Sequence, residues 1–123
     1  MDLYAEIILD HYRNPHHYGK LEKSTFSAKD SNPLCGDSIQ MDLLVDTDGS
    51  IKDVGFVGKG CAISQASASM LTDELINKSL PEAVQMTNED MYNLVGVPLT
   101  PARVKCALLS LYVLKKAADK TQK

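Results

Sequence analysis

The chain has 123 residues, of which 44% are hydrophobic and 24% charged, and this is the length and composition of one ordinary globular domain. Its formal net charge is −3 and its pI is about 5.5. These values, with no long block of like charges, exclude the basic surface of a nucleic-acid-binding protein and the polybasic patch of a membrane-surface protein. We therefore expect a single domain, residues 1–123, whose partners are proteins or small ions.

Neither a secretory signal nor a membrane span is visible in the sequence. The N-terminus carries Asp2, Glu6 and Asp10 where a signal would carry a basic region followed by an apolar run. No apolar run reaches the roughly 18 residues of a membrane span. We expect a cytoplasmic protein. In that reducing compartment, three cysteines are metal ligands, catalytic groups or small buried hydrophobic residues.

The N-terminal third predicts one helix and one weak strand. Apolar residues at helical spacing indicate an amphipathic helix from Asp2 to Tyr12, which Asn14-Pro15 ends. The segment 21–29 has weak periodicity and predicts a short edge strand around Phe26.

A β-hairpin follows. The run Ser38–Val45 alternates in polarity, so that Gln40 and Asp42 face away from an apolar face formed by Ile39, Met41, Leu43 and Val45. The turn signal Asp46-Thr47-Asp48-Gly49 then leads into a second strand, Ile51–Val57. The turn lacks the spacing and the terminal glutamate of a calcium-binding EF-hand, so we interpret it as a plain turn.

A glycine-rich stretch and a helix come next. Gly55, Gly58 and Gly60 do not match the spacing of a phosphate-binding loop, and they are better explained by a close turn of the backbone around Cys61. Small residues after Cys61 begin a helix that continues to Ile76. Cys61 is therefore expected at the helix N-terminus, where unpaired N–H groups favour a thiolate.

The C-terminal part is predicted to be helical. Ser79 and Glu82 form a capping-box pattern at the start of a short helix, and residues 88–94 predict one or two further turns that end before Gly96. Thr100-Pro101 are typical of the first residues of a helix, which continues to about Ala118. The expected buried stripe of this last helix consists of Val104, Ala107, Leu108, Leu111, Tyr112 and Leu114.

Three histidines, His11, His16 and His17, lie close together near the N-terminus. Histidine is a common metal ligand, but no cysteine or carboxylate accompanies these three at a typical ligand spacing. We expect them to have surface or loop roles.

Four residues indicate a metal site. Cys35 and Asp37 share one loop, Cys61 lies at a strand-to-helix junction, and Cys106 lies in the second turn of the last helix. These positions are near the ends of elements, where side chains can meet. If they converge, three thiolates and a harder carboxylate suit Zn²⁺ or a [2Fe-2S] cluster. An oxygen ligand in place of a fourth thiolate would ease metal release, which favours transfer over storage.

Three other classes of site fit the sequence less well. A structural zinc module usually has two short-spaced pairs of Cys or His ligands, whereas these ligands are scattered. A thioredoxin-like enzyme would need a Cys-x-x-Cys motif, and the sequence has none. A Cys-His hydrolase would need a positioned histidine, and nothing in the sequence ties a histidine to a cysteine.

Four segments carry a family resemblance: Ile8-Leu9-Asp10-His11-Tyr12-Arg13-Asn14-Pro15, Cys35-Gly36-Asp37, Gly60-Cys61-Ala62-Ile63-Ser64 and Lys105-Cys106-Ala107-Leu108-Leu109. Together they resemble the U-type iron-sulfur scaffold family, which comprises IscU, SufU and the N-terminal part of NifU. The resemblance implies an α+β fold of the SufE/NifU-like type, with a small antiparallel sheet of about three strands and helices packed on one side. It also implies a solvent-facing site formed by Cys35, Asp37, Cys61 and Cys106.

The resemblance implies one of two functions for these four residues. A scaffold, which is not an enzyme, accepts sulfur from a cysteine desulfurase as a persulfide, here first on Cys106 or Cys61. It then assembles a [2Fe-2S] cluster on Cys35, Asp37, Cys61 and Cys106 and passes it to acceptor proteins. A zinc-dependent sulfurtransferase of the SufU type would instead hold Zn²⁺ on the same residues and free Cys35 to attack the persulfide of the desulfurase.

Three features place the chain between the IscU and SufU subtypes. Lys105 stands where IscU-type members have histidine, as in SufU-type members, and it either stabilises a neighbouring thiolate or reaches solvent. The segment Leu99-Thr100-Pro101-Ala102-Arg103 differs from the Leu-Pro-Pro-Val-Lys segment that IscU presents to its chaperone, which argues against binding of that chaperone. The spacing from Cys61 to Cys106, 106 − 61 = 45, lacks the usual SufU-type insertion.

Overall fold

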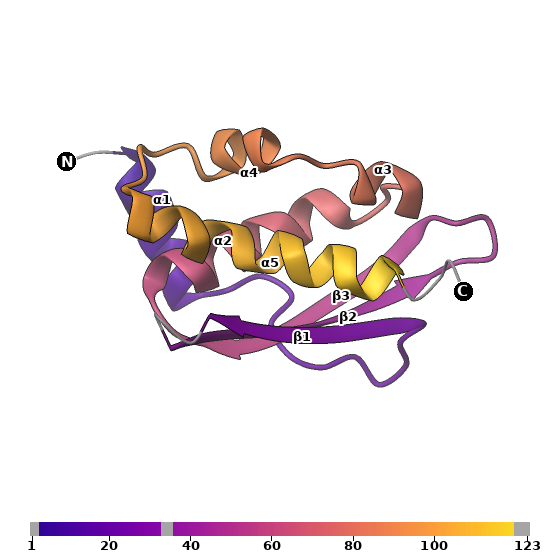
Figure 1. Ribbon diagram of the computed structural model, residues 1–123. Helices are drawn as coiled ribbons and strands as arrows, with labels where there is room; N and C mark the ends of the chain where they lie inside the picture. Colours follow the sequence, from indigo (N-terminus) through magenta and orange to yellow (C-terminus); the bar gives the residue numbers. More distant parts are fainter. Residues whose placement is uncertain (1–2, 33–35, 120–123) are drawn as a thin grey trace.

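The computed structural model describes residues 3–32 and 36–119, in which helices gather on one face of a three-stranded antiparallel sheet (Figure 1). The elements in chain order are α1 (Leu3–Arg13), β1 (Phe26–Asn32), β2 (Asp37–Val45), β3 (Ile51–Lys59), α2 (Ala62–Leu75), α3 (Leu80–Val84), α4 (Asn88–Val95) and α5 (Pro101–Asp119). Helices α2 and α5 pack on the sheet, while α1, α3 and α4 pack against these two helices. The predicted α+β class is confirmed.

The order of the strands is β1-β2-β3, so the weak strand around Phe26 is an edge strand as predicted. Asn32 at the end of β1 pairs with Asp37 at the start of β2, and Ser38 pairs with Lys59 at the end of β3. The start of β2 and the end of β3 therefore meet at the same end of the sheet. This pairing decides where the candidate site forms.

The second face of β2 is less exposed than the alternating pattern predicted. Asp42 is only 5% exposed, because it accepts hydrogen bonds from the Ser27 hydroxyl (2.6 Å) and the Leu21 backbone N–H (3.1 Å). The loop after α1 also bonds to β3, where the Gly19 N–H donates to the Phe56 carbonyl (2.7 Å). The loop after α1 therefore covers Asp42, which the alternating pattern set apart from the apolar face of β2.

The predicted helix boundaries are confirmed where cap residues marked them. At α3, Ser79 and Glu82 form both hydrogen bonds of a capping box, which satisfy N–H groups that the first turn leaves unpaired. Helix α2 stops at Leu75, and Asn77 follows with a φ of 71°. Helix α4 ends before its C-cap residue Gly96, whose φ of 77° lies in the left-handed region that glycine favours.

Helix α5 buries most of its predicted stripe, but Tyr112 is 49% exposed. Tyr112 lies four residues after buried Leu108, which is why the spacing placed it in the stripe. It also lies seven residues after Lys105 and four before Lys116, so it shares the solvent-facing side of the helix with these two exposed residues. The prediction for Tyr112 is wrong, since its ring lies at the helix surface.

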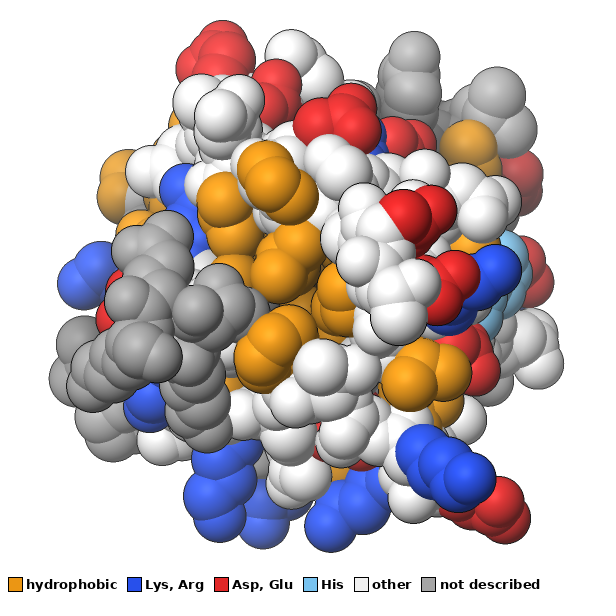
Figure 2. Space-filling view, turned by 90° about the vertical axis from the view of Figure 1, so that its right-hand side faces the viewer, with side chains coloured by type: hydrophobic (Ala, Val, Ile, Leu, Met, Phe, Trp, Pro, Cys, Tyr) orange, Lys and Arg blue, Asp and Glu red, His pale blue; other side chains and the backbone are white. Residues whose placement is uncertain are grey.

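The core lies between the sheet and helices α2 and α5. At the end of the molecule that carries α3 and the β2–β3 turn, hydrophobic side chains reach the surface between charged groups (Figure 2). Val45 and Leu80, which belong to these elements, are half-buried and pack against the main core. Among the described helices, none combines the length and hydropathy of a transmembrane span.

Candidate metal centre

Asp37 is the first residue of β2 and is fully buried (0% exposed), which is unusual for a carboxylate. Its Oδ1 accepts a hydrogen bond from the backbone N–H of Cys61 (2.8 Å). Its Oδ2 lies 3.6 Å from the Sγ of Cys61, within reach of a thiol hydrogen bond. The carboxylate thus holds the segment that follows β3 against the start of β2.

Gly60 makes this close approach possible. Its φ is 138°, a conformation that side-chain-bearing residues rarely adopt, and a Cβ at this position would overlap Oδ1 of Asp37. The explanation of Gly60 as a glycine that lets the backbone turn closely around the site agrees with this geometry.

Cys61 is the N-cap residue of α2, as predicted. Its Sγ accepts a weak hydrogen bond from the Ser64 N–H (3.5 Å), while the Ser64 hydroxyl donates to the Cys61 carbonyl (3.1 Å). A sulfur at an N-cap faces the positive end of the helix dipole. The Cys61 side chain is only partly buried, so its sulfur remains accessible.

Cys106 reaches the same place from α5. It is 2% exposed, and its Sγ lies 3.7 Å from the Ala102 carbonyl one turn earlier. One ligand atom from each of Asp37, Cys61 and Cys106 lies within 4.8 Å of the others. The start of a strand, the N-terminus of one helix and the second turn of another thus bring these three residues together at one end of the sheet.

Cys35, the fourth predicted ligand, lies outside the described residues, and its place in the site remains a prediction. The described neighbours on both sides are close, since Asn32 pairs with Asp37 and the Gly36 N–H donates to the Asn32 carbonyl (2.9 Å).

The charge balance of this group favours a bound cation. Two thiolates beside a buried carboxylate would place like charges close together, at a high cost without a positive partner. Among the described residues, no lysine or arginine forms an ion pair with Asp37. Lys105 precedes Cys106, but its side chain is exposed. A metal ion or a metal cluster would supply the missing positive charge and fits a donor set of two thiolates and one carboxylate.

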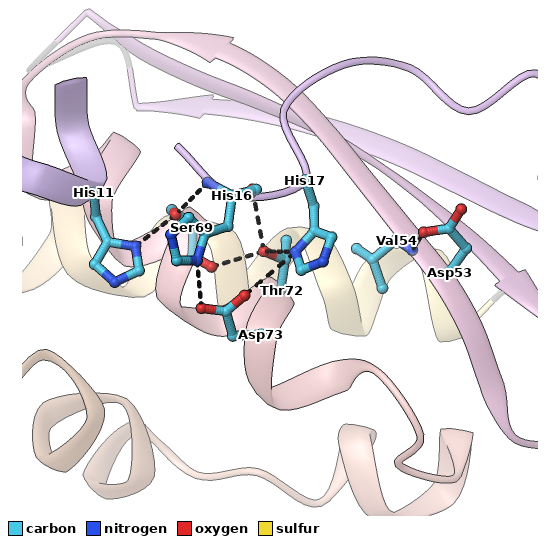
Figure 3. A network of polar contacts seen from close by, with 8 residues as sticks. All are labelled: His11, His16, His17, Asp53, Val54, Ser69, Thr72 and Asp73. Atoms are coloured by element: carbon cyan, nitrogen blue, oxygen red, sulfur yellow. Dashed lines mark hydrogen bonds and ion pairs between the residues drawn. The ribbon is translucent and has the colours of Figure 1, made fainter. Parts of the chain in front are cut away.

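A second polar group joins α1, the loop after it and α2 (Figure 3). His11, His16 and Asp73 each offer a ligand atom, and these atoms also lie within 4.8 Å of one another. His16 and His17 lie exposed in the loop, as predicted, whereas His11 lies half-buried in α1. The sequence did not indicate their carboxylate partner. Asp73 is 57 residues away from His16 in the sequence, so no local spacing could indicate it.

A three-stranded sheet with helices on one face, carrying thiol and carboxylate groups at one end, defines the chain as an α+β domain with a potential metal site. The model of the NifU-like N-terminal domain matches residues 3–123. The chain belongs to this family.

Curated relatives cover almost all of the chain. It is 36% identical to the zinc-dependent sulfurtransferase SufU of Bacillus subtilis, over 98% of this chain and 92% of the relative. It is 35% identical to the iron-sulfur cluster assembly scaffold protein IscU of Streptococcus pyogenes, over 97% of this chain and 84% of the relative. The chain is therefore nearly equally identical to a SufU-type relative and to an IscU-type relative.

Solved structures agree with the fold. The SufU protein of Fervidobacterium islandicum superposes with a TM-score of 0.81 at 32% identity, covering 92% of this chain and 94% of that one. The N-terminal part of a NifU-like protein from Brucella abortus superposes with a TM-score of 0.79 at 21% identity, covering 98% and 94%, and supports the fold alone. The predicted SufE/NifU-like arrangement is confirmed.

Proposed function

We propose that this chain is an iron-sulfur cluster assembly scaffold that accepts sulfur from a cysteine desulfurase, assembles a [2Fe-2S] cluster and transfers it to acceptor proteins. The observation that carries the proposal is the convergence of Asp37, Cys61 and Cys106 within 4.8 Å. Family membership and relatives named as IscU scaffolds support it. The cluster is the cargo of this function and leaves with the acceptor.

Cys35, Asp37, Cys61 and Cys106 are the proposed ligands of the cluster. Cys35 is included because it lies two residues before Asp37 in the sequence and offers the third thiol. Sulfur is proposed to arrive as a persulfide on Cys61 or Cys106. Cys61 is the more accessible of these two thiols, because Cys106 is 2% exposed.

A zinc-dependent sulfurtransferase is the second candidate, favoured by 36% identity to the SufU of Bacillus subtilis. In this role the same residues would hold Zn²⁺, which would keep the thiols deprotonated. Cys35 would attack the terminal sulfur of the persulfide on the desulfurase, whose cysteine would leave as a thiolate. The chain would then have an enzymatic activity, which the scaffold function does not require.

The proposed partners are a cysteine desulfurase and iron-sulfur acceptor proteins, within a single scaffold domain over residues 1–123. Residues 100–103 at the start of α5 are exposed, but their sequence differs from the chaperone-binding segment of IscU. We do not include that chaperone among the partners. A cytoplasmic location is proposed because a site with reduced thiols persists in a reducing compartment.

Metal analysis of the full chain, purified with and without air, tests the proposal. The scaffold function predicts iron with acid-labile sulfide after anaerobic purification and its loss in air. Stoichiometric zinc that iron cannot replace would instead support the sulfurtransferase. A chain that retains neither zinc nor iron, even after anaerobic reconstitution, would contradict both functions.

Replacing Asp37 tests whether the oxygen ligand eases cluster release. In Asp37→Ala, we expect the reconstituted cluster to persist several-fold longer against a chelator or an acceptor protein, measured by the decay of its visible absorbance. The alanine variant also loses the hydrogen bond from the Cys61 N–H, so the yield of reconstitution should fall.

Asp37→Asn separates these two effects, because an amide oxygen can still accept the Cys61 N–H. The matched control is Asp30→Asn, an exposed carboxylate on the neighbouring strand β1, which should leave cluster lifetime unchanged. Faster cluster loss from both Asp37 variants would refute the role of the oxygen ligand in release.

A further inference from the structure

The histidine group, which consists of His11, His16 and Asp73, lies where α1 and the loop after it meet the distant helix α2. His11 comes from the last turns of α1, His16 from the loop after it, and Asp73 from α2 (Figure 3). The rings of His11 and His16 lie 4.5 Å apart between centroids, and Nδ1 of His16 lies 2.7 Å from Oδ2 of Asp73. Two imidazoles and a carboxylate therefore face one another across the packed helices.

Ser69 holds the two histidines in place. Its hydroxyl oxygen lies 2.7 Å from Nδ1 of His11 and accepts a hydrogen bond from the backbone N–H of His16 (2.8 Å). Ser69 is fully buried, one turn before Asp73 on α2. The three potential ligands are thus tied to one helix by hydrogen bonds and do not depend on a chance surface contact.

The loop that carries His16 is also anchored to the sheet. The Phe56 N–H donates to the His17 carbonyl (3.1 Å), and the Gly19 N–H donates to the Phe56 carbonyl (2.7 Å). Nδ1 of His17 lies 3.0 Å from the Thr72 hydroxyl and 3.5 Å from Oδ1 of Asp73. His17 therefore contacts the second oxygen of the Asp73 carboxylate, as an outer partner does around a metal ligand.

The group formed by His11, His16 and Asp73 is open to solvent on one side, and its surroundings favour the neutral form of the His11 imidazole. The side chains of His16 and Asp73 are 47% and 42% exposed, so an ion and its waters can reach them. Burial, and then the nearby His16, lower the pKa of His11, against opposing effects of Asp73 and Asp10. A metal ligand must be the neutral imidazole, so this environment does not oppose binding.

We propose that His11, His16 and Asp73 form a second metal site, which binds a divalent first-row transition-metal ion through two imidazole nitrogens and one carboxylate oxygen. This donor set suits ions such as Zn²⁺, Fe²⁺ and Co²⁺, with the remaining coordination positions filled by water. Ligand bonds of about 2.0–2.2 Å place tetrahedral ligand atoms roughly 3.3 Å apart. The group would reach this spacing by small side-chain rotations.

This second site goes beyond the proposed function and is separate from the thiol site, which is the group of Asp37, Cys61 and Cys106. Both lie along α2, where Asp73 follows Cys61 by 73 − 61 = 12 residues. At the rise of an α-helix this corresponds to about 18 Å, too far for one ion to contact both.

Titration of the full chain with Co²⁺ under anaerobic conditions tests the proposal, with binding measured by equilibrium dialysis and absorbance. Cobalt bound to thiolate has strong charge-transfer absorption, whereas cobalt bound to nitrogen and oxygen has only weak bands. We expect the wild-type chain to bind two Co²⁺ ions, only one of them with the thiolate absorption.

His16→Ala and Asp73→Asn should each bind the second ion at least about 100-fold more weakly. Loss of a residue that only hydrogen-bonds to a ligand would weaken metal binding by about 10–100-fold, so a larger effect indicates a direct ligand. Both variants should keep the thiolate absorption. Asp10→Asn is the matched control, because Asp10 is an exposed carboxylate beside His11 that lies outside the ligand group, and it should bind two ions. A wild-type chain that binds only the thiolate-ligated ion, or variants that keep the second ion at unchanged affinity, would overturn the proposal.

Discussion

Replacing Cys61 or Cys106 by serine should abolish the visible charge-transfer absorption that the wild-type chain gains when it is reconstituted anaerobically with iron and sulfide. A serine hydroxyl has nearly the size of the thiol but does not ionise near neutral pH, so it cannot replace a thiolate ligand. The structure brings both sulfurs to Asp37, and we expect the same loss for Cys35→Ser. Bound iron and acid-labile sulfide should fall together with the absorbance.

Folding must be checked in the same samples, because Cys106 is buried within α5. Far-ultraviolet circular dichroism and thermal unfolding of each apo-protein separate loss of a ligand from loss of the fold. Cys61 is the cleaner test, since its side chain is only partly buried. Unchanged absorption in all three serine variants would exclude the four-ligand site.

Gly60→Ala should disrupt the site without removing any proposed ligand. At a φ of 138°, the added methyl group would overlap Oδ1 of Asp37, so the carboxylate or the Cys61 segment must move. We expect most of the reconstituted cluster to be lost and the free energy of unfolding to fall on the order of 1–3 kcal/mol. Iron content after reconstitution and chemical denaturation measure the two effects.

Gly49→Ala is the matched control. Gly49 also has a positive φ, 88°, but its added Cβ would meet no atom within 4 Å. This variant should lose about 1–2 kcal/mol of stability from backbone strain while keeping the full cluster content. Equal cluster content in the Gly60→Ala and Gly49→Ala variants would show that contact between Gly60 and Asp37 does not position the site.

Local chemistry explains which elements could be predicted. Helix starts were marked by side chains that bond to free N–H groups, such as Ser79 at α3, and α4 ends at a glycine suited to a left-handed conformation, Gly96. Cys61 at the N-cap of α2 follows from the same local reasoning. The error at Tyr112 and the loop that covers Asp42 both concern burial, which depends on neighbours from other segments.

The sequence by itself determined the order and type of the elements, and it placed the cysteines near element ends. Only the tertiary structure decided which polar groups meet. Asp37 reaches Cys61 because β2 pairs with β3 in one register, and Asp73 reaches His16 because the loop after α1 packs on α2. Contacts across 24 and 57 residues depend on strand pairing and helix packing, which no local spacing encodes.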